Sequence, residues 1–386
     1  MKNTSKIILA VIITFVLTLS VATTAIVWLL SGYRQSYEKF GKVTDIIERS
    51  YVEEYDIDAC EEAAINAVLS ELGDKYAVYY DEEDAEETFR MIDGYYIGVG
   101  IEVYANTETG NIEIFSAFED SPAQRAGIQS GDIIKSIDKK EYTASEIADA
   151  VLYMKGTRSE KPLETDFEIV VIRDGKEIPF TLKREKINMH KVSSKIVDGI
   201  CYIRYPGFTT DSLKELTKIV ESLDESVAGI VIDIRNNSGG EFGSAIDMCD
   251  LFLDEGLIMY TVDRDGKKTE YFAEEGATKL PLAVLVNNTT ASASEIFAGC
   301  MQDRGRAVII GEETYGKGVT QTIQYLNPLD LSEGALKLTV CKNYTPDGKW
   351  INEKITPDAI IENMQIDKDI TKDAAFCEAV KRLKKD

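Results

Sequence analysis

The sequence predicts a multidomain α+β and α/β protein, in which an apolar N-terminal segment and a helical arm precede a β-rich domain and an α/β core. Three observations favour this organisation: an uncharged run over residues 7–30, short β-type runs after residue 95, and alternating strand and helix patterns after residue 186. The chain has 386 residues, 44% of them hydrophobic, which is enough for two or three domains of roughly 100 to 200 residues. A wholly disordered chain is therefore excluded.

The first element, the uncharged segment 7–30, predicts a transmembrane helix. At about 1.5 Å per residue it would span roughly 36 Å, which is enough for the hydrocarbon core of a bilayer. Lys2 and Lys6 precede it and give a weak bias toward a cytoplasmic N-terminus. A cleaved signal peptide is the alternative, although its apolar region would normally be about 7 to 15 residues long. We expect residues 1–33 to be a single-pass signal anchor in the cell membrane, with the rest of the chain extracytoplasmic.

The next two segments differ in their residue patterns. Residues 34–91 are acidic and carry apolar side chains at helical spacing, which predicts a helical arm that packs on the chain or on a second copy in a homodimer. Residues 92–185 are expected to form a β-rich domain, because Gly and Asp turns separate short β-type runs. These runs cover 97–104, 112–117, 132–137, 167–173 and 178–183.

Residues 186–386 are expected to form an α/β core with a largely parallel sheet. Its strands are predicted at 200–205, 227–234, 282–286, 307–310 and 335–341. Its helices are predicted at 211–223, before Leu253, at 292–304 with Gly305 as the cap, and near 372–383. The last of these helices is a second candidate for self-association.

Composition excludes several kinds of function. Asp and Glu number 67 against 43 Lys and Arg, and the formal net charge of -24 makes nucleic acid an unfavourable partner. His190 is the only histidine, which excludes a mechanism with two imidazoles and a metal site built mainly from histidine. We expect no metal and no cofactor, and we expect His190 to lie in a connection between domains without a catalytic role. The six cysteines include no Cys-x-x-Cys pair, and no framework of disulfides is expected.

The first stretch that could carry chemistry lies between the predicted strand 282–286 and the helix that starts at Ser292. A serine at a helix N-terminus lies among unpaired N–H groups and the positive end of the dipole, which would stabilise an oxyanion beside it. The simpler interpretation is that Ser292 or Ser294 caps the helix and Glu295 completes its first turn. On this stretch alone, the cap is the better interpretation.

A second stretch, Gly316-Lys317-Gly318, changes that balance. Its glycines cannot shield the lysine, so the amine can project into a cleft, although a solvated turn is the commonest place for such a lysine. To act as a base, Lys317 must be neutral, and lowering its pKa from about 10.4 to about 7.5 requires roughly 4 kcal/mol. Burial can lower the pKa by that amount, and a nearby carboxylate would oppose it.

The third stretch is the turn 233–240, which follows a buried strand and ends in Gly239 and Gly240. Ligands of open α/β sheets bind beyond the carboxyl ends of the strands, where the backbone N–H groups of such a turn are presented. Taken alone, it is also compatible with an ordinary strand-to-helix turn. Together, the three stretches supply a nucleophile, a base and oxyanion donors.

These stretches carry a resemblance to a known family. The run Thr290-Ala291-Ser292-Ala293-Ser294-Glu295, followed by Thr314-Tyr315-Gly316-Lys317-Gly318 and Gln321, resembles the carboxy-terminal processing (tail-specific) peptidases, which are serine proteases with a Ser-Lys dyad. The resemblance implies a crotonase-like α/β core in which Ser292 is the nucleophile and Lys317 the general base. It implies that Gln321 orients the lysine and that backbone N–H groups of Ala293 and Gly239 bind the oxyanion.

Two positions depart from the family pattern. Thr290 stands where a serine is usual, and Ser238 stands where a proline is common. Neither position carries the proton transfer, so the dyad is still expected.

The β-rich segment resembles the PDZ domain that is embedded in these peptidases, on residues 94–101 and 126–134. The resemblance implies that the loop Gly98-Val99-Gly100-Ile101 binds the carboxylate of a peptide's C-terminus, while the adjacent strand edge pairs with the peptide. A pocket lined by Ile101 and Val151 favours an apolar last residue. Lys155 stands where the family often has an arginine that helps the PDZ domain communicate with the active site, so that switch is not carried over.

The sequence therefore predicts a membrane-anchored serine endopeptidase. It would recognise the C-termini of extracytoplasmic proteins through its PDZ domain and cleave them with Ser292 and Lys317. A catalytically silent PDZ adaptor is one alternative, but it would predict the loss of one of these two residues. A hydratase or thioesterase of the crotonase type is another, but that class usually acts with carboxylates and has no use for a PDZ domain.

Overall fold

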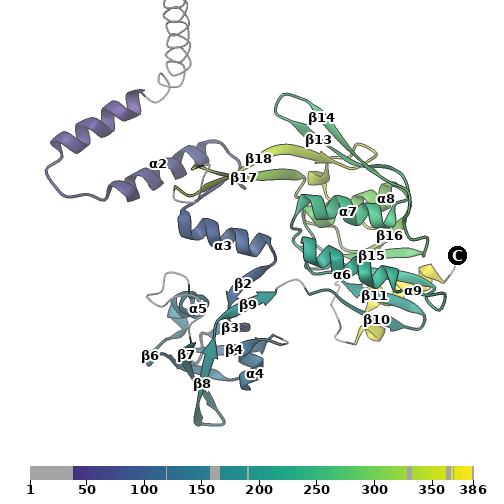
Figure 1. The fold of residues 1–386 in the computed structure, drawn as a ribbon, viewed down its shortest axis with the longest axis horizontal. Helices are drawn as coiled ribbons and strands as arrows, with labels where there is room; N and C mark the ends of the chain where they lie inside the picture. Colours follow the sequence, from purple (N-terminus) through teal and green to yellow (C-terminus); the bar gives the residue numbers. More distant parts are fainter. Residues whose placement is uncertain are drawn as a thin grey trace, which may run out of the picture. The chain divides into compact units, whose positions relative to one another are not determined.

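A computed structural model describes residues 38–118, 120–156, 166–188, 191–327, 333–361, 367 and 369–384 (Figure 1). The chain divides into two compact units, Met1–Ala67 and Val68–Asp386. The predicted transmembrane segment 7–30 and His190 lie outside the described residues. Among the helices that the structure describes, none combines the length and the apolar character needed to cross a bilayer.

The predicted arm is helical over residues 38–50, α2 (Ile57–Glu71) and α3 (Glu82–Ile92). It differs from the prediction at β1 (Val78–Tyr80), which is a strand. The reason is tertiary, because the β1 backbone pairs antiparallel with β18 (Ala335–Tyr344), more than 250 residues further along the chain.

The β-rich segment contains a sheet in the order β3-β4-β5-β7-β8, with β6 paired to β5. Its strands are β3 (Ile101–Asn106), β4 (Asn111–Ala117), β5 (Ile133–Ile137), β6 (Lys140–Glu141), β7 (Asp166–Arg173) and β8 (Lys176–Lys183), and its helices are α4 (Pro122–Ala126) and α5 (Ile147–Lys155). The predicted run 97–104 is divided between β3 and β2 (Tyr95–Gly98), which pairs with β9 (Glu185–Asn188). The break occurs at Gly100, whose φ is 72° and where a Cβ would lie 2.3 Å from the Cβ of Ser121.

The core contains a sheet in the order β10-β11-β12-β15-β16-β19, which is parallel from β11 onward. These strands are β10 (Ser193–Val197), β11 (Ile200–Arg204), β12 (Gly229–Asp233), β15 (Leu282–Val286), β16 (Ala307–Gly311) and β19 (Ala359–Ile360). The structure agrees with the predicted parallel sheet and with its four central strands. Only the short outer strands β10 and β19 were not predicted.

Helices cover both faces of the core sheet. Ile230 and Ile232 pack with α6 (Thr210–Glu221), α7 (Phe242–Phe252) and α8 (Ala293–Asp303), whereas Val231, which points to the opposite face, packs with α9 (Ala374–Leu383). Every residue of β12 and β15 is buried. Burial on both faces explains why these strands are continuous apolar runs in the sequence.

A second sheet in the core unit has the order β1-β18-β13-β14, with β17 also paired to β18. Sequence analysis did not predict β13 (Gly256–Asp263), β14 (Lys268–Ala273) or β17 (Val319–Tyr325). β17 has no fully buried residue, and β14 has one. Backbone pairing rather than core burial forms β14 and β17, so their sequences lack the apolar runs that predict a strand. β13 does bury Ile258 and Met259 in the core.

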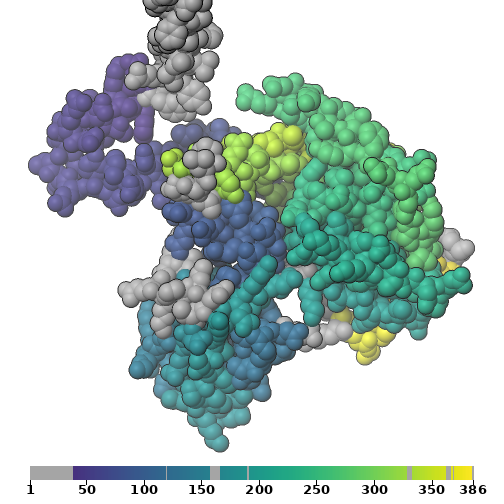
Figure 2. Space-filling model, viewed as in Figure 1, coloured from purple at the N-terminus to yellow at the C-terminus, as the bar shows by residue number. Residues whose placement is uncertain are grey.

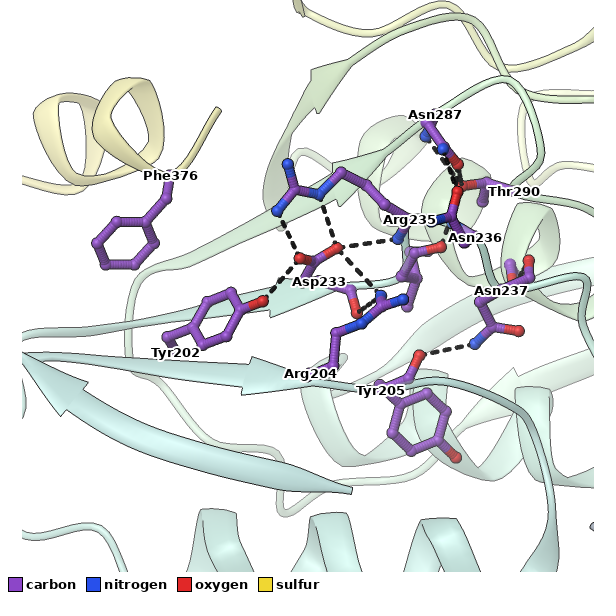
Figure 3. A network of polar contacts seen from close by, with 12 residues as sticks. Tyr202, Arg204, Tyr205, Asp233, Arg235, Asn236, Asn237, Asn287, Thr290 and Phe376 are labelled. Carbon is purple, nitrogen blue, oxygen red and sulfur yellow. Dashed lines mark hydrogen bonds and ion pairs between the residues drawn. The ribbon is translucent and has the colours of Figure 1, made fainter. Parts of the chain in front are cut away.

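A buried arginine ties the end of β12 to the last helix. Figure 3 shows its contacts with Asp233. Arg235 Nε and Nη2 donate to the carboxylate of Asp233 at 2.9 and 2.6 Å, and Nη1 donates to Asp373 at 2.9 Å. Burial alone would lower the pKa of the Arg235 guanidinium, but the hydrogen bonds and charges of both carboxylates raise it. Asp373 also accepts the N–H of Phe376 at 3.0 Å and thereby caps α9. The turn after β12 and the C-terminal helix therefore share one ionic network.

Replacing Arg235 by Met should lower the free energy of unfolding by about 3–5 kcal/mol, because Asp373 loses the buried guanidinium and Asp233 keeps only its longer contact with Arg204. Arg204→Met is the matched control: its guanidinium contacts the same Asp233 at 3.3 Å but is 28% exposed, so a loss of about 1 kcal/mol or less is expected. Urea denaturation at pH 7 measures both values. Equal losses would contradict the assignment of Arg235 as the buried link.

Candidate active site

Three turns meet at the carboxyl edge of the parallel sheet. The strand register aligns them, because Asp233 lies opposite Leu285 and Val286 lies opposite Gly311. Gly311 has a φ of 136°, and a Cβ there would lie 1.9 Å from the carbonyl oxygen of Val286, so this strand end requires glycine. The turns follow β12, β15 and β16 and comprise residues 234–241, 287–292 and 312–318.

Asn237 joins the first two turns. Its backbone carbonyl accepts hydrogen bonds from the N–H of Ala291 at 3.1 Å and from the hydroxyl of Ser294 at 3.0 Å. Its side-chain amide donates to the carbonyl of Tyr205 at 2.9 Å (Figure 3), and its Oδ1 accepts the N–H of Gly239 at 2.9 Å. The side chain is completely buried. Ser294, one of the two candidate caps, is therefore a link between turns.

Thr290, the first departure from the family pattern, lies at the same junction. Its hydroxyl donates to the carbonyl of Ile234 at 3.0 Å and accepts the N–H of Asn287 at 2.9 Å. The N–H of Asn236 in turn donates to Oδ1 of Asn287 at 2.9 Å (Figure 3). A serine hydroxyl can make the same bonds, so threonine preserves this junction.

Ser292 lies at the sharp end of the second turn, immediately before α8. Its φ of 58° and ψ of -118° are strained for a residue with a Cβ. Such strain is typical of a nucleophilic serine presented between a strand and a helix. Its N–H donates to the carboxylate of Glu295 at 2.9 Å. Ser292 therefore occupies the N-cap position of α8, but its backbone has the strained conformation of a sharp turn.

The two predicted oxyanion donors are neighbours of Ser292. A Cβ at Gly239, whose φ is 106°, would lie 2.9 Å from the Cβ of Ser292 and 3.0 Å from the backbone nitrogen of Ala293. The N–H of Gly239 donates to Oδ1 of Asn237. The N–H of Ala293 has no acceptor within the described part of the chain. One donor is free, and the other must leave Asn237 before it can bind an oxyanion.

Lys317 and Ser292 line one cavity of about 430 Å³. Burial lowers the pKa of the Lys317 amine, and the charge of Lys337 lowers it further, whereas the charge of Glu295 raises it. The amine lies over the ring of Tyr76, 5.0 Å from the ring centre. No hydrogen bond between described residues joins this amine to the Ser292 hydroxyl. The direction of the pKa change is the one that a lysine base needs, and Glu295 is the carboxylate that opposes it.

Gln321 lines the same cavity from β17, where a bulge shifts the strand register. Its side-chain amide donates to the carbonyl of Tyr76 at 2.9 Å. The structure thus brings Gln321 to the site through Tyr76. Sequence reasoning did not select Tyr76, which lies in a segment with a helical pattern, or Lys337, which lies inside a predicted strand. Only contacts between distant segments reveal them.

A second cavity, of about 420 Å³, lies at the loop Gly98-Val99-Gly100-Ile101. Val151 and Met154 of α5 line it with this loop. β3 forms an edge of its sheet, since it pairs with β4 alone among the described strands. The ring of Tyr96 lies against Gly98, where a Cβ would meet its Cε2 at 2.5 Å. An unpaired strand edge beside an apolar cavity can accept an extended peptide.

Lys155 links the second cavity to α3. It lines the second cavity and forms an ion pair with Glu87 of α3 at 2.6 Å. Thr88 and Phe89, the next residues of α3, line the cavity that holds Ser292. Lysine at this position therefore keeps an ionic contact with the helix that borders the first cavity.

The Gly239→Ala variant should react with a fluorophosphonate at Ser292 at least about a hundredfold more slowly, because the added Cβ displaces the backbone beside the nucleophile. Gly243→Ala is the matched control, since a Cβ there meets nothing within 4 Å. Mass spectrometry of the modified peptide over time measures both rates, and circular dichroism verifies folding. A folded Gly239→Ala protein that reacts at the wild-type rate would contradict the close packing.

Comparison with known proteins identifies the family. The model of peptidase family S41 matches residues 199–361, and the model of the activating protease CtpB N-terminal domain matches residues 22–84. A carboxyl-terminal-processing protease of Synechocystis is 38% identical over 276 residues, which cover 69% of this chain and 62% of that protein. A carboxy-terminal-processing protease of Bartonella bacilliformis is 34% identical over 343 residues, which cover 85% of this chain and 76% of that protein.

Solved structures show the same fold. A photosystem II D1 C-terminal processing protease has a TM-score of 0.51 and 25% identity, and the match covers 87% of this chain and 89% of that one. A putative S41 protease from Bacteroides fragilis has a TM-score of 0.57 and 16% identity, with 87% and 92% coverage. The predicted family is confirmed: the chain belongs to peptidase family S41, among the carboxyl-terminal-processing serine proteases.

Proposed function

We propose that the chain is a membrane-anchored serine endopeptidase that cleaves extracytoplasmic proteins near their C-termini. One observation carries the proposal: Ser292, on a strained turn at a helix N-terminus, shares a cavity with Lys317, an amine whose pKa is lowered by burial. The family supports the same reaction, since the relatives from Synechocystis and Bartonella are named for processing carboxyl termini.

In the proposed reaction, a substrate peptide bond enters the cavity beside Ser292. Neutral Lys317 accepts the hydroxyl proton while the Ser292 Oγ attacks the carbonyl carbon. The resulting oxyanion accepts a hydrogen bond from the N–H of Ala293 and, once Asn237 has released it, from the N–H of Gly239. Lys317 then gives the proton to the leaving amine. Water, deprotonated by Lys317, then attacks the ester carbonyl on Ser292, and Lys317 returns the proton to the departing Ser292 Oγ.

Gln321 positions the base in this proposal. Its bond to the Tyr76 carbonyl holds the ring that faces the Lys317 amine. The ring covers one side of the amine, where exclusion of water favours the neutral form and the π face favours the ammonium form.

Residues 92–185 act in this proposal as a PDZ domain that captures the substrate's C-terminus. The free edge of β3 and the apolar cavity beside it support this role. The peptide would extend the sheet at β3, and its carboxylate would bind the N–H groups of the loop 98–101. Its last side chain would enter between Ile101 and Val151, so an apolar residue is favoured.

The uncharged segment 7–30 supports anchoring by residues 1–33, with residues 34–386 outside the cytoplasm. The N-terminal unit supports a homodimer, because helix 38–50 exposes apolar side chains and α2 buries none of its residues. Phe40 and Ile46 are 52% and 64% exposed. A second copy would cover such side chains.

Ser292→Ala and Lys317→Met should each reduce cleavage of an unfolded protein by at least about a thousandfold, because each removes one half of the dyad. The wild-type kcat/KM should rise with pH through a limb centred below 10.5, since the neutral amine is active and burial lowers its pKa. Fluorescent-substrate assays with the full chain in detergent measure both. Wild-type rates in either variant would disprove the dyad.

Peptides with an apolar last residue and a free carboxylate should bind the Ser292→Ala chain at least about tenfold more tightly than their amidated forms, because amidation removes the charge that the loop binds. Fluorescence polarisation measures the affinity. Val151→Asp should weaken binding, whereas Val52→Asp, at a side chain that is 92% exposed, should not. Equal affinity for both peptide forms would rule out carboxylate capture.

A further inference from the structure

Glu295 is a completely buried carboxylate in the first turn of α8, and it accepts four hydrogen bonds. Its Oε1 accepts the hydroxyl of Thr314 at 2.5 Å and the N–H of Gly316 at 2.7 Å. Its Oε2 accepts the N–H of Lys317 at 2.8 Å and the N–H of Ser292 at 2.9 Å. One oxygen atom therefore holds the backbones of both residues of the dyad.

A helix cap does not account for this arrangement. The capping role requires only the bond to the N–H of Ser292. The other three donors belong to the turn after β16, which carries Lys317 and reaches the site from a different strand. Burying a carboxylate is costly unless hydrogen bonds compensate it, and here both oxygens are fully engaged.

We infer that Glu295 is a positioning residue whose carboxylate sets the separation between the Ser292 nucleophile and the Lys317 base. This inference rests on the proposed hydrolysis by that dyad. Glu295 acts through the backbones of the two residues and through the hydroxyl of Thr314, so it takes no proton in the reaction.

The charge of Glu295 has a second effect on the same reaction. It raises the pKa of Lys317, in opposition to burial and to the charges of Lys337 and Lys75, while the Tyr76 ring covers the amine. It therefore disfavours the neutral amine before attack, and it stabilises the ammonium ion that forms when the Ser292 proton moves. Loss of the negative charge of Glu295 should shift the pH dependence, whereas loss of its hydrogen bonds should lower kcat. The two roles can therefore be separated by experiment.

The test compares Glu295→Gln with Glu295→Asp in the full chain. Glu295→Gln should lower kcat about a hundredfold with KM changed less than about twofold, since the oriented contact serves the transition state. The acid limb of the pH–rate profile of this variant should move to lower pH, because the pKa of Lys317 falls further without the negative charge of Glu295. In Glu295→Asp the negative charge is kept, but the shorter side chain cannot reach all four donors. Its kcat should therefore fall, while the pH at the midpoint of the acid limb should stay unchanged.

Two other substitutions act as controls. Glu313→Gln makes the same change at an exposed side chain of the same turn and should leave kcat and the pH limb unchanged. Lys337→Met removes a charge that lowers the pKa of Lys317, so it should move the limb to higher pH, opposite to Glu295→Gln. A limb that moves in the same direction in both variants would overturn the electrostatic assignment.

If Glu295→Gln does not fold, the pair Thr314→Val and Thr314→Ser decides the question. Valine removes one donor to the carboxylate and should lower kcat about tenfold, and serine should restore it. A wild-type kcat in Glu295→Gln or in Thr314→Val would overturn the inference. A wild-type kcat in Glu295→Asp, beside a lowered kcat in Glu295→Gln, would overturn it as well, because the charge alone would then suffice.

Hydrogen exchange separates this inference from the proposed function. In Glu295→Gln, the amides of Ser292 and Lys317 should exchange at least about tenfold faster than in the wild type, whether or not the chain cleaves any substrate. Unchanged exchange would overturn the positioning role. If the wild-type chain cleaves no substrate but the amides of Ser292 and Lys317 still exchange faster in Glu295→Gln, only the proposed hydrolytic function is overturned.

Discussion

Parallel pairing of β12, β15 and β16 is the constraint on which the site depends. Because the strands run in one direction and are buried on both faces, their carboxyl ends share one edge, and the turns that follow them are forced together. The residues of the candidate site are therefore placed by backbone hydrogen bonds along these strands. Gly311, where a Cβ would lie 1.9 Å from the Val286 carbonyl oxygen, shows how little freedom remains at this edge.

Buried polar groups then fix the turns against one another. Asn237 and Glu295 use nearly all their hydrogen-bonding atoms, and most of these bonds join separate turns. Arg235 lies between two carboxylates. The same removal of water that makes these contacts strong also lowers the pKa of Lys317. The close contacts between the turns and the lowered pKa of the Lys317 amine thus have a common physical origin.

The part of the fold that depends on burial was predictable from the sequence. The central strands and helices of the core follow from apolar runs and from periodicity, and Ser292, Lys317 and the Gly239 turn follow from residue types that lie beyond strand ends. The part that depends on pairing with distant segments was not predictable. β1 is a strand because it pairs with β18. Tyr76 contacts Lys317 although the two residues are 241 positions apart in the sequence. Glu295 resembled an ordinary cap because its three further donors lie about twenty residues downstream. The anchor and His190 lie outside the described residues, so they remain predictions.

The position of Asp373 joins the turn after β12 to a distant helix. This carboxylate completes the shell around Arg235, yet it lies at the start of α9, 138 residues further along the chain. Without α9, the buried guanidinium would lack its second counter-ion. The turn that carries Gly239 therefore depends on a helix that contributes no residue to the cavity of Ser292.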